Sequence, residues 1–410
     1  MSRTLSVLCA CAALAVCCGC GGDNGSGPAP EVAVSLDPGA MDVEVGRSAT
    51  ITTQVTGTSN TGLTWFVNGI ENGDDVFGTI THNSPATYTA PDTLPGQTTV
   101  EVRAISVADT AKYDSCWVTI TFKVIHVDIT SGDDAVGTGY AHEPVKTIHR
   151  GNELVPDGGT VLVAPGTYDT DHGETFTIYP GPGVTIEGEN WETCIVRGGS
   201  PGGTAFYLGN TSAAVRKFTF ESSPELGPDR WEHYVTMHGD NIRVDSLRTA
   251  QRSYYAPIRF KNCTGPIVEN CVFDVPLLDP APPGIGQNRG FEFLGGNTGI
   301  IIRGCTISGF RQGFHMGSDN DPLIENCIIE DNEYGVNLCC YHDEEHNANP
   351  DLGGGARGSA GGNFIRNNTV YGINNQTYNV IYAKYNTWTN DPPVAGEDYY
   401  NESTGGVVYE

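Results

Sequence analysis

The chain has 410 residues, a length that favours two domains, and it carries 49 acidic against 22 basic residues. The net charge of −27 at pH 7 argues against nucleic acid and against anionic membrane surfaces as partners, because both would repel the chain. With 53 glycines, Asn-rich turns and almost no long helical periodicity, the composition indicates an all-β protein with many tight corners.

The N-terminus is typical of an export signal. The apolar run Leu5–Val16 is too short to cross a bilayer and ends in a cluster of cysteines and glycines. This segment resembles a bacterial lipoprotein signal, in which a cysteine that follows small residues becomes the lipidated N-terminus. We assign residues 1–20 to the signal and expect lipidation at Cys20, with Cys17 and Cys18 as alternatives. That implies an exported protein, anchored by lipid to a bacterial outer membrane or cell surface; an ordinary cleaved signal is the alternative.

Residues 21–30 read as a flexible tether, and residues 31–123 change to alternating strands in a β-sandwich pattern. The segment Leu63–Gly69 contains a tryptophan followed by Val-Asn-Gly, and Ala86–Pro91 ends in Tyr-Thr-Ala-Pro. Both motifs resemble the bacterial immunoglobulin-like (Ig-like) domains of surface proteins, which implies a spacer or adhesive module. We expect Trp65 to pack in the core of this domain and not to serve as a sugar platform.

The second domain, residues 126–410, contains a repeat. Ile301–Ile307 reads Ile-Ile-Arg-Gly-Cys-Thr-Ile, and 22 positions later Leu323–Ile329 reads Leu-Ile-Glu-Asn-Cys-Ile-Ile. A fixed period in the twenties, with two short strand patterns per period, is typical of a β-solenoid, whose stacked coils share one core. Downstream we take Phe364–Val370 as another copy, with Asn368 in the place of the cysteine.

The repeat also explains the cysteines. Several of them fall on or beside strand positions that point inward, one coil apart, so we expect a ladder of buried thiols in place of disulfides. The members of this predicted ladder are Cys263, Cys271, Cys305 and Cys327.

A short helix is expected to begin at Pro144 and to carry Val145, Ile148 and Val155 on one face. Such a helix would cap the first coil, whose core and backbone edge would otherwise be open.

The opening of this domain resembles a known family. Lys146–Ile148, Val163–Tyr168 and Val184–Gly188 are similar to right-handed parallel β-helix proteins with a pectin-lyase-like fold, in particular to an uncharacterised bacterial branch known as a domain of unknown function. The resemblance covers about residues 127–410 and implies the handedness. We therefore predict an Ig-like β-sandwich followed by a right-handed parallel β-helix with a short N-terminal capping helix.

Strand alternation places polar residues on the outer face of this β-helix. In Phe314-His315-Met316 the apolar neighbours point into the core, so His315 points outward. Polar residues hold the same position in successive coils, and we expect them to form a surface column at the inter-strand spacing of ~4.8 Å. The column contains, in order, Tyr207, Thr236, Arg259, Glu292, His315, Asn337 and Asn374.

Three residues of the column, Arg259, Glu292 and His315, would bind a sugar and supply general acid and base groups. We expect Glu292 to stay ionised beside Arg259, and His315 to be held protonated beside Glu292. The further candidates for ligand binding are Tyr207, Asn337 and Asn374. A structural polar ladder, or a binding face without chemistry, would explain the same residues.

Other site chemistry has weaker support. The Asp clusters and Gly-His-Gly and Arg-Ile-Lys motifs of polygalacturonase-like hydrolases are absent, and an inverting hydrolase needs two carboxylates where the column offers only Glu292. Asp319 and Asp321 offer oxygen ligands for one calcium ion, but Ser318–Pro322 is equally good turn sequence, which we favour. A zinc site within Cys339–His346 is disfavoured because no second Cys or His pair follows.

The sequence thus favours a surface-anchored β-helix protein that binds polysaccharide along one face, with no cofactor required beyond the calcium alternative. The second interpretation is a polysaccharide lyase or glycoside hydrolase that uses Glu292, His315 and Arg259. The oligomeric state is not indicated by the sequence.

Overall fold

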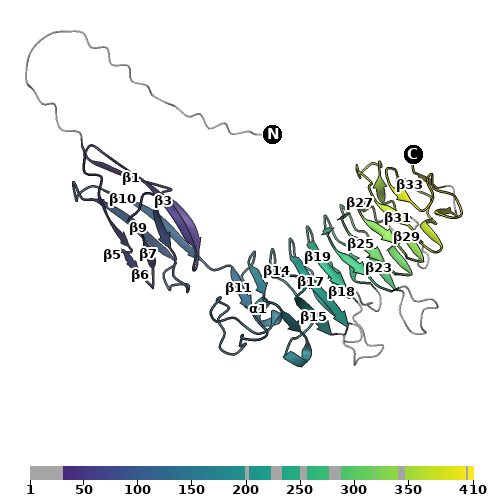
Figure 1. Ribbon diagram of the computed structural model, residues 1–410, viewed down its shortest axis with the longest axis horizontal. Helices are drawn as coiled ribbons and strands as arrows, with labels where there is room; N and C mark the ends of the chain where they lie inside the picture. The colour runs from purple at the N-terminus through teal and green to yellow at the C-terminus, as the bar shows by residue number, and fades with distance from the viewer. Residues whose placement is uncertain are drawn as a thin grey trace, which may run out of the picture. The chain divides into compact units, whose positions relative to one another are not determined.

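A computed structural model describes residues 31–198, 203–222, 233–249, 256–276, 288–317, 319–339, 347–402 and 405–410. The predicted signal, the tether and Cys20 lie outside these ranges. The chain divides into two compact units between Thr121 and Phe122 (Figure 1). No helix within the described ranges has the length and apolar character needed to span a bilayer.

The first unit is an Ig-like β-sandwich of two sheets, with strand orders β1-β3-β8-β7-β6 and β2-β10-β9-β4-β5. Trp65 is buried between them with a relative exposure of 2%, so it packs in the core as predicted. The strands are β1 (Ala33–Asp37), β2 (Ala40–Glu44), β3 (Ser48–Thr56), β4 (Leu63–Val67), β5 (Ile70–Glu71), β6 (Gly73–Asp74), β7 (Gly78–Ile80), β8 (Ala86–Thr89), β9 (Thr99–Ser106) and β10 (Tyr113–Thr121).

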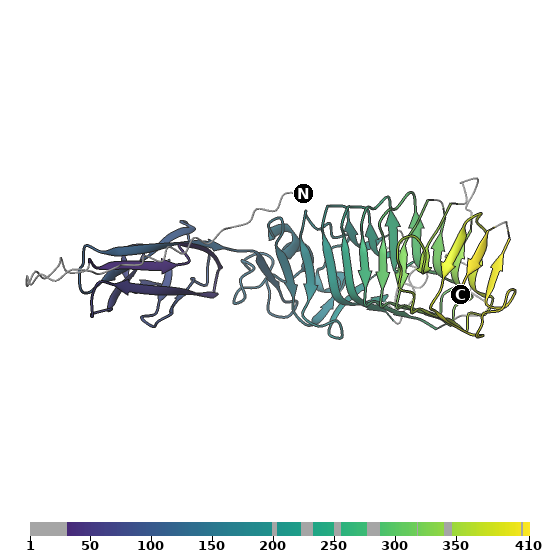
Figure 2. The same cartoon turned by 90° about the horizontal axis from the view of Figure 1, so that it is seen from above.

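The second unit is a right-handed parallel β-helix, in which strands stack as successive rungs (Figures 1 and 2). One wall is an eight-stranded parallel sheet, and an 18-stranded sheet forms the rest of each coil. The eight-stranded sheet contains β16 (Thr204–Leu208), β18 (His233–Met237), β20 (Ile258–Lys261), β23 (Arg289–Leu294), β26 (Gln312–Met316), β29 (Tyr334–Leu338), β32 (Tyr371–Asn375) and β35 (Tyr399–Asn401).

The 18-stranded sheet supplies two short strands to most coils. Its members are β11 (Val124–Val127), β12 (Thr160–Val163), β13 (Gly166–Tyr168), β14 (Thr185–Gly188), β15 (Cys194–Gly198), β17 (Ala214–Ser222), β19 (Arg243–Thr249), β21 (Ile267–Glu269), β22 (Val272–Asp274), β24 (Ile301–Arg303), β25 (Thr306–Ser308), β27 (Leu323–Glu325), β28 (Ile328–Glu330), β30 (Asp351–Gly353), β31 (Phe364–Arg366), β33 (Val380–Ala383), β34 (Thr387–Trp388) and β36 (Gly406–Val408).

A single left-handed residue makes the corner between the two short strands of a coil. Asn270, Gly304 and Asn326 hold this position in consecutive coils with φ between 54° and 61°. Asparagine and glycine adopt this conformation at the lowest cost, which explains the Asn or Gly that precedes each cysteine in the repeat.

The cysteine after each corner points into the core. Cys271, Cys305 and Cys327 are buried and free, and burial raises the pKa of the Cys305 and Cys327 thiols well above the ordinary value. The predicted thiol ladder is confirmed for these three residues. Cys263 is also a buried free thiol, but it lies after β20 and donates to the carbonyl oxygen of Met237 at 2.9 Å.

The prediction that Asn368 continues this ladder is wrong. Phe364 pairs with Ile328, so β31 is the strand after the corner, and Asn363 takes the place of the cysteine. The strand before that corner is β30, which pairs with β27 of the preceding coil. Asn368 hydrogen bonds instead to Asn332 in the preceding coil.

The short helix is α1 (Ile148–Leu154), which begins after the N-cap Thr147; a 3-10 turn, η1 (Thr170–His172), follows further on. The helix contacts β11 and β12, and a Cβ on Gly151 would lie 2.6 Å from the Val127 side chain. The helix thus caps the first coil as predicted, but it begins later than Pro144. Val145 is not helical, because it forms a parallel bridge with Val127.

Glycine also holds one position in consecutive strands of the eight-stranded sheet. A Cβ on Gly290, Gly313 or Gly335 would lie 2.5–2.6 Å from the carbonyl oxygen of the glycine in the next rung. No Cβ fits at that distance, so the coils stack closely here because the side chain is absent.

Candidate functional site

The predicted column is present in the strand register of the eight-stranded sheet. Each member pairs with the next in an adjacent parallel strand, and the register adds Tyr400 on β35 after Asn374. We use the name polar column for Thr236, Arg259, Glu292, His315, Asn337 and Asn374.

The expectation that the polar column forms an open surface is wrong for most of its length. Glu292 and His315 are each only 3% exposed, and Thr236, Asn337 and Asn374 are also buried. The Arg259 side chain is the exception, with 23% of its surface exposed. Alternation predicted correctly that these side chains leave the coil interior, but it carries no information about what else lies over them.

Glu292 is the centre of a buried ionic group. Its carboxylate accepts from Nε of Arg259 at 2.7 Å and from Nη1 of Arg289, and Nε2 of His233 lies 3.8 Å away. Burial by itself would raise the pKa of Glu292, but the charge and hydrogen bond of Arg259 outweigh burial and bring the pKa below its ordinary value. Glu292 is therefore ionised, as predicted.

The two histidines of this group are neutral at pH 7. Burial, followed by the charge of Arg259, lowers the pKa of His233 to about 4. Burial and the charge of Arg289 lower the pKa of His315 to about 3, and Glu292 offsets this only in part. The prediction that Glu292 holds His315 protonated is therefore wrong, because desolvation and a nearby guanidinium both disfavour the imidazolium ion.

The lower half of the polar column is an amide ladder. Asn374 donates from Nδ2 to Oδ1 of Asn337 at 2.7 Å, and Asn337 donates to Sγ of Cys339 at 3.1 Å. Cys339 lies 3.7 Å from Nδ1 of His315, so a chain of contacts links the amides to the ionic group. With both amides buried, these two ligand-binding candidates have the geometry of structural residues.

The upper end of the column is open. Tyr207 hydrogen bonds through its hydroxyl to Nδ1 of the exposed His238 at 2.7 Å. Ile178 bridges to Phe206, and the ring of the following residue, Tyr179, lies 5.6 Å from the ring of Tyr207. Tyr179 is 61% exposed, so aromatic surface faces solvent one coil before Tyr207.

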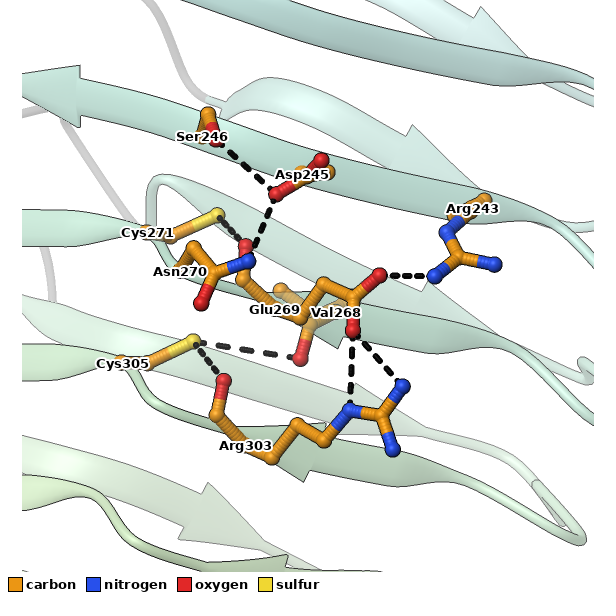
Figure 3. Close-up of polar contacts among 9 residues, drawn as sticks. All are labelled: Arg243, Asp245, Ser246, Val268, Glu269, Asn270, Cys271, Arg303 and Cys305. Atoms are coloured by element: carbon orange, nitrogen blue, oxygen red, sulfur yellow. Dashed lines mark hydrogen bonds and ion pairs between the residues drawn. The ribbon is translucent and has the colours of Figure 1, made fainter.

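The 18-stranded sheet carries a comparable ionic group on its own outer face. Glu269 on β21 lies between Arg243 of the strand before it and Arg303 of the strand after it (Figure 3). Nε of Arg303 donates to Glu269 at 2.8 Å, and the arginine side chains are 45–48% exposed. Burial opposes the charge on Glu269, but both arginines outweigh it and hold the pKa of Glu269 below its ordinary value.

The calcium candidates are not brought together with a third ligand. Asp319 has a positive φ of 39°, typical of a turn, and Asn320 is buried against Asn297. Asp321 lies 3.4 Å from Nη1 of Arg357, a cation of the protein itself. Among the described residues no group of three or more His, Cys, Asp or Glu is placed to hold a metal ion. Residues 340–346 of the disfavoured zinc segment lie outside the described ranges.

Three neighbours of the column were missed from the sequence: Arg289, His233 and Tyr179. Arg289 and His233 begin their strands and stand outside the alternating part of the repeat, so periodicity gave no signal for them. Tyr179 had a signal, because Ile178-Tyr179 has the same apolar-Tyr pattern as Phe206-Tyr207 one coil later.

The fold and the column define a pectin-lyase-like parallel β-helix with a polar column on its eight-stranded sheet. Residues 130–395 match the family described as "Protein of unknown function (DUF1565)", and the chain belongs to that family. A comparison with curated proteins gives no match. Among solved structures, a rhamnogalacturonan lyase is similar, with 16% identity and a TM-score of 0.50 over 63% of this chain and 72% of that chain. At this identity, the similarity shows a shared fold.

Proposed function

We propose that the protein binds polysaccharide along the eight-stranded sheet of its β-helix and does not cleave it. The observation that carries this proposal is the contrast within the column: Glu292 is buried between two guanidinium groups, whereas Arg259 and Tyr207 reach solvent. A guanidinium fixed by a buried carboxylate is a preorganised hydrogen-bond donor, and a tyrosine ring offers both an apolar face and a hydroxyl.

Hydrolysis is the less favoured chemistry. An inverting or retaining glycoside hydrolase needs two carboxyl groups on either side of the scissile bond, one of them protonated to act as the acid. Among the described residues of the column only Glu292 carries a carboxylate, and its pKa lies below the ordinary value. An ionised, buried glutamate cannot donate the proton that this mechanism needs.

The proposal includes display at the cell surface. A lipidated Cys20 would anchor the chain, residues 21–30 would act as the tether, and the Ig-like unit would hold the β-helix away from the membrane. The lipoprotein-type signal in the sequence supports this arrangement. Radiolabelled palmitate incorporation in the wild type, with loss in Cys20→Ala, would test the anchor.

Binding is tested with a panel of neutral and acidic plant and bacterial polysaccharides, including rhamnogalacturonan, by affinity gel electrophoresis. We expect at least one polymer to retard the wild type. Arg259→Gln should lower the affinity for that polymer by about tenfold, because it removes roughly one hydrogen bond to a charged group. The matched control is Arg243→Gln, which removes one of two arginines from Glu269 on the other sheet. Equal retardation of both variants, or no retardation of the wild type by any polymer, would contradict the proposal.

A lyase is the second candidate, because the Arg259 side chain reaches solvent beside the histidines of the buried ionic group. In β-elimination a base removes the proton α to a uronate carboxyl group, and the bond to the leaving sugar breaks to give an unsaturated end. In this mechanism His233 or His315 would have to act as the base, and the lowered pKa makes each a weak one, whereas Arg259 would stabilise the developing negative charge. Unsaturated products that accumulate with the wild type and disappear in His315→Asn would favour the lyase over binding alone.

A further inference from the structure

We propose that the bound polysaccharide is a neutral chain held at two tyrosine platforms, one at each end of the polar column. The first platform is Tyr179 with Tyr207, and the second is Tyr371 with Tyr400. The inference rests on the proposed function and deepens it, because it names the class of ligand and the surfaces that hold it.

The backbone of the first platform is held in place on both sides of Tyr179. Ile178 pairs with the strand of Phe206, and Asn152 and Asn210 donate to the carbonyl oxygens of Tyr179 and Pro180. The Tyr207 hydroxyl is bound to His238, which fixes the orientation of its ring. The platform is therefore preorganised, and little side-chain entropy is lost when a ligand stacks on it.

The second platform lies at the other end of the same sheet. The rings of Tyr371 on β32 and Tyr400 on β35 stack with centroids 5.3 Å apart and planes 16° apart. Tyr334 on β29 extends the row, with its ring centroid 6.3 Å from that of Tyr371. Tyr400 is 37% exposed, although it directly follows the buried Asn374 in the column.

Paired tyrosine rings that reach solvent, tilted in the first platform and stacked in the second, match the chemistry of a sugar. The C–H face of a pyranose packs on an aromatic ring, and its hydroxyl groups hydrogen bond to the phenol oxygen and to the imidazole of His238. Nucleic-acid bases also stack on aromatic rings, but they bring phosphates, which a chain with a net charge of −27 repels. The same repulsion disfavours polyanionic glycans such as polygalacturonate, so a neutral chain fits best.

The two platforms are spaced for an extended chain. Tyr207 and Tyr400 belong to one column and are separated by seven inter-strand steps of ~4.8 Å, or about 34 Å along the helix axis. One ligand that reaches both platforms gains effective concentration at the second platform once the first is engaged. A polymer should therefore bind more tightly than a fragment that reaches one platform only.

The test is isothermal titration of the full chain with mixed-linkage β-glucan, galactomannan, xylan and polygalacturonate, and with short oligosaccharides of the polymer that binds best. Two variants each remove one platform: Tyr179→Ala with Tyr207→Ala, and Tyr371→Ala with Tyr400→Ala. Each should lower polymer affinity by tenfold or more, toward the affinity of the short oligosaccharides. The single variant Tyr179→Ala, at the most exposed ring of the four, serves if a double variant fails to fold.

The matched control is Tyr382→Ala. Tyr382 lies on β33 of the 18-stranded sheet, and its exposed fraction of 39% is similar to the 37% of Tyr400. Its polymer affinity should equal that of the wild type. Unchanged affinity in both platform variants would overturn the inference, as would tighter binding of polygalacturonate than of every neutral polymer. If Arg259→Gln weakens binding while both platform variants bind as the wild type does, the proposed function is supported and the inference about the tyrosine platforms is contradicted. Absence of any binding by the wild type contradicts both.

Discussion

The two sheets of the β-helix each place one glutamate between two arginines. On the 18-stranded sheet, Glu269 contacts arginines that are nearly half exposed, whereas Glu292 on the eight-stranded sheet contacts Arg289, only 4% exposed, and Arg259. The charges are the same, but solvent screens the first group much more than the second. The comparison shows that the same motif has half-exposed arginines around a buried glutamate on one wall and is buried almost throughout on the other.

The largest effect is expected from Glu292→Gln, which leaves Arg259 and Arg289 without their shared carboxylate. Removing one partner of a buried ion pair lowers the free energy of unfolding by about 3–5 kcal/mol, because the remaining charge stays buried without a counter-charge. Urea denaturation of the wild type and the variant measures this loss. A loss below about 1 kcal/mol would show that Glu292 is no more important for stability than a surface carboxylate.

Acid pH should separate the two walls next, because the histidines lie only in the buried group. His315 has a folded-state pKa of about 3 against 6.5 in a model peptide, so between these values the unfolded state binds more protons. The free energy of unfolding therefore falls as the pH is lowered from 6.5, by about 3 kcal/mol at pH 4 for this one group, at 1.36 kcal/mol per pKa unit. Urea titrations at pH 6.5 and pH 4 measure this loss, and the free energy of unfolding of His315→Asn should fall by about 3 kcal/mol less than that of the wild type. Identical pH dependence of the two proteins would contradict the buried, neutral imidazole.

Close backbone contact between coils gives a third test on the eight-stranded wall. Gly313→Ala would place a Cβ 2.6 Å from the carbonyl oxygen of Gly335, so the coils must separate, at a cost of about 1–3 kcal/mol. Gly317→Ala is the control, because a Cβ there meets nothing within 4 Å. Thermal unfolding should show a lower midpoint for the first variant and little change for the second. Equal midpoints would mean that the glycine position is not sterically restricted.

The smallest effect is expected from Glu269→Gln, which makes the same chemical change on the exposed wall. Glu269 is buried, but both arginines are nearly half exposed and stay hydrated when its charge is removed, so the free energy of unfolding should fall by only about 1 kcal/mol or less. Added salt should reduce the difference further, since both arginines are accessible to counterions. A loss as large as that of Glu292→Gln would remove the distinction between the two walls.

The sequence predicted the column because the repeat and the strand alternation fix both register and direction. The repeat alone predicted the pairing of four residues in adjacent strands: Arg259, Glu292, His315 and Asn337. Burial was not predictable in the same way, since it depends on neighbours that the period does not encode. The error in the charge of His315 follows from this, because the expected pKa assumed a solvated imidazole beside Glu292 alone.

Where the period is interrupted, the predicted strand register is also wrong. The strand β30 reads Asp-Leu-Gly and lacks the apolar alternation of its equivalents, so the pattern does not identify it as a strand. The next strand was then assigned to the wrong side of the corner. The signal that was available is Gly362-Asn363, a left-handed glycine followed by a buried residue, as in Gly304-Cys305.

Hydroxyl-radical footprinting with and without a saturating polysaccharide tests most directly whether the eight-stranded sheet is the binding face. Binding there predicts that oxidation of Tyr179 and Tyr400 falls when the polymer is added, while oxidation of Tyr382 on the other sheet, which is about as exposed as Tyr400, is unchanged. Protection of Tyr382 without protection of Tyr179 and Tyr400 would place the ligand on the opposite wall and contradict the proposed function.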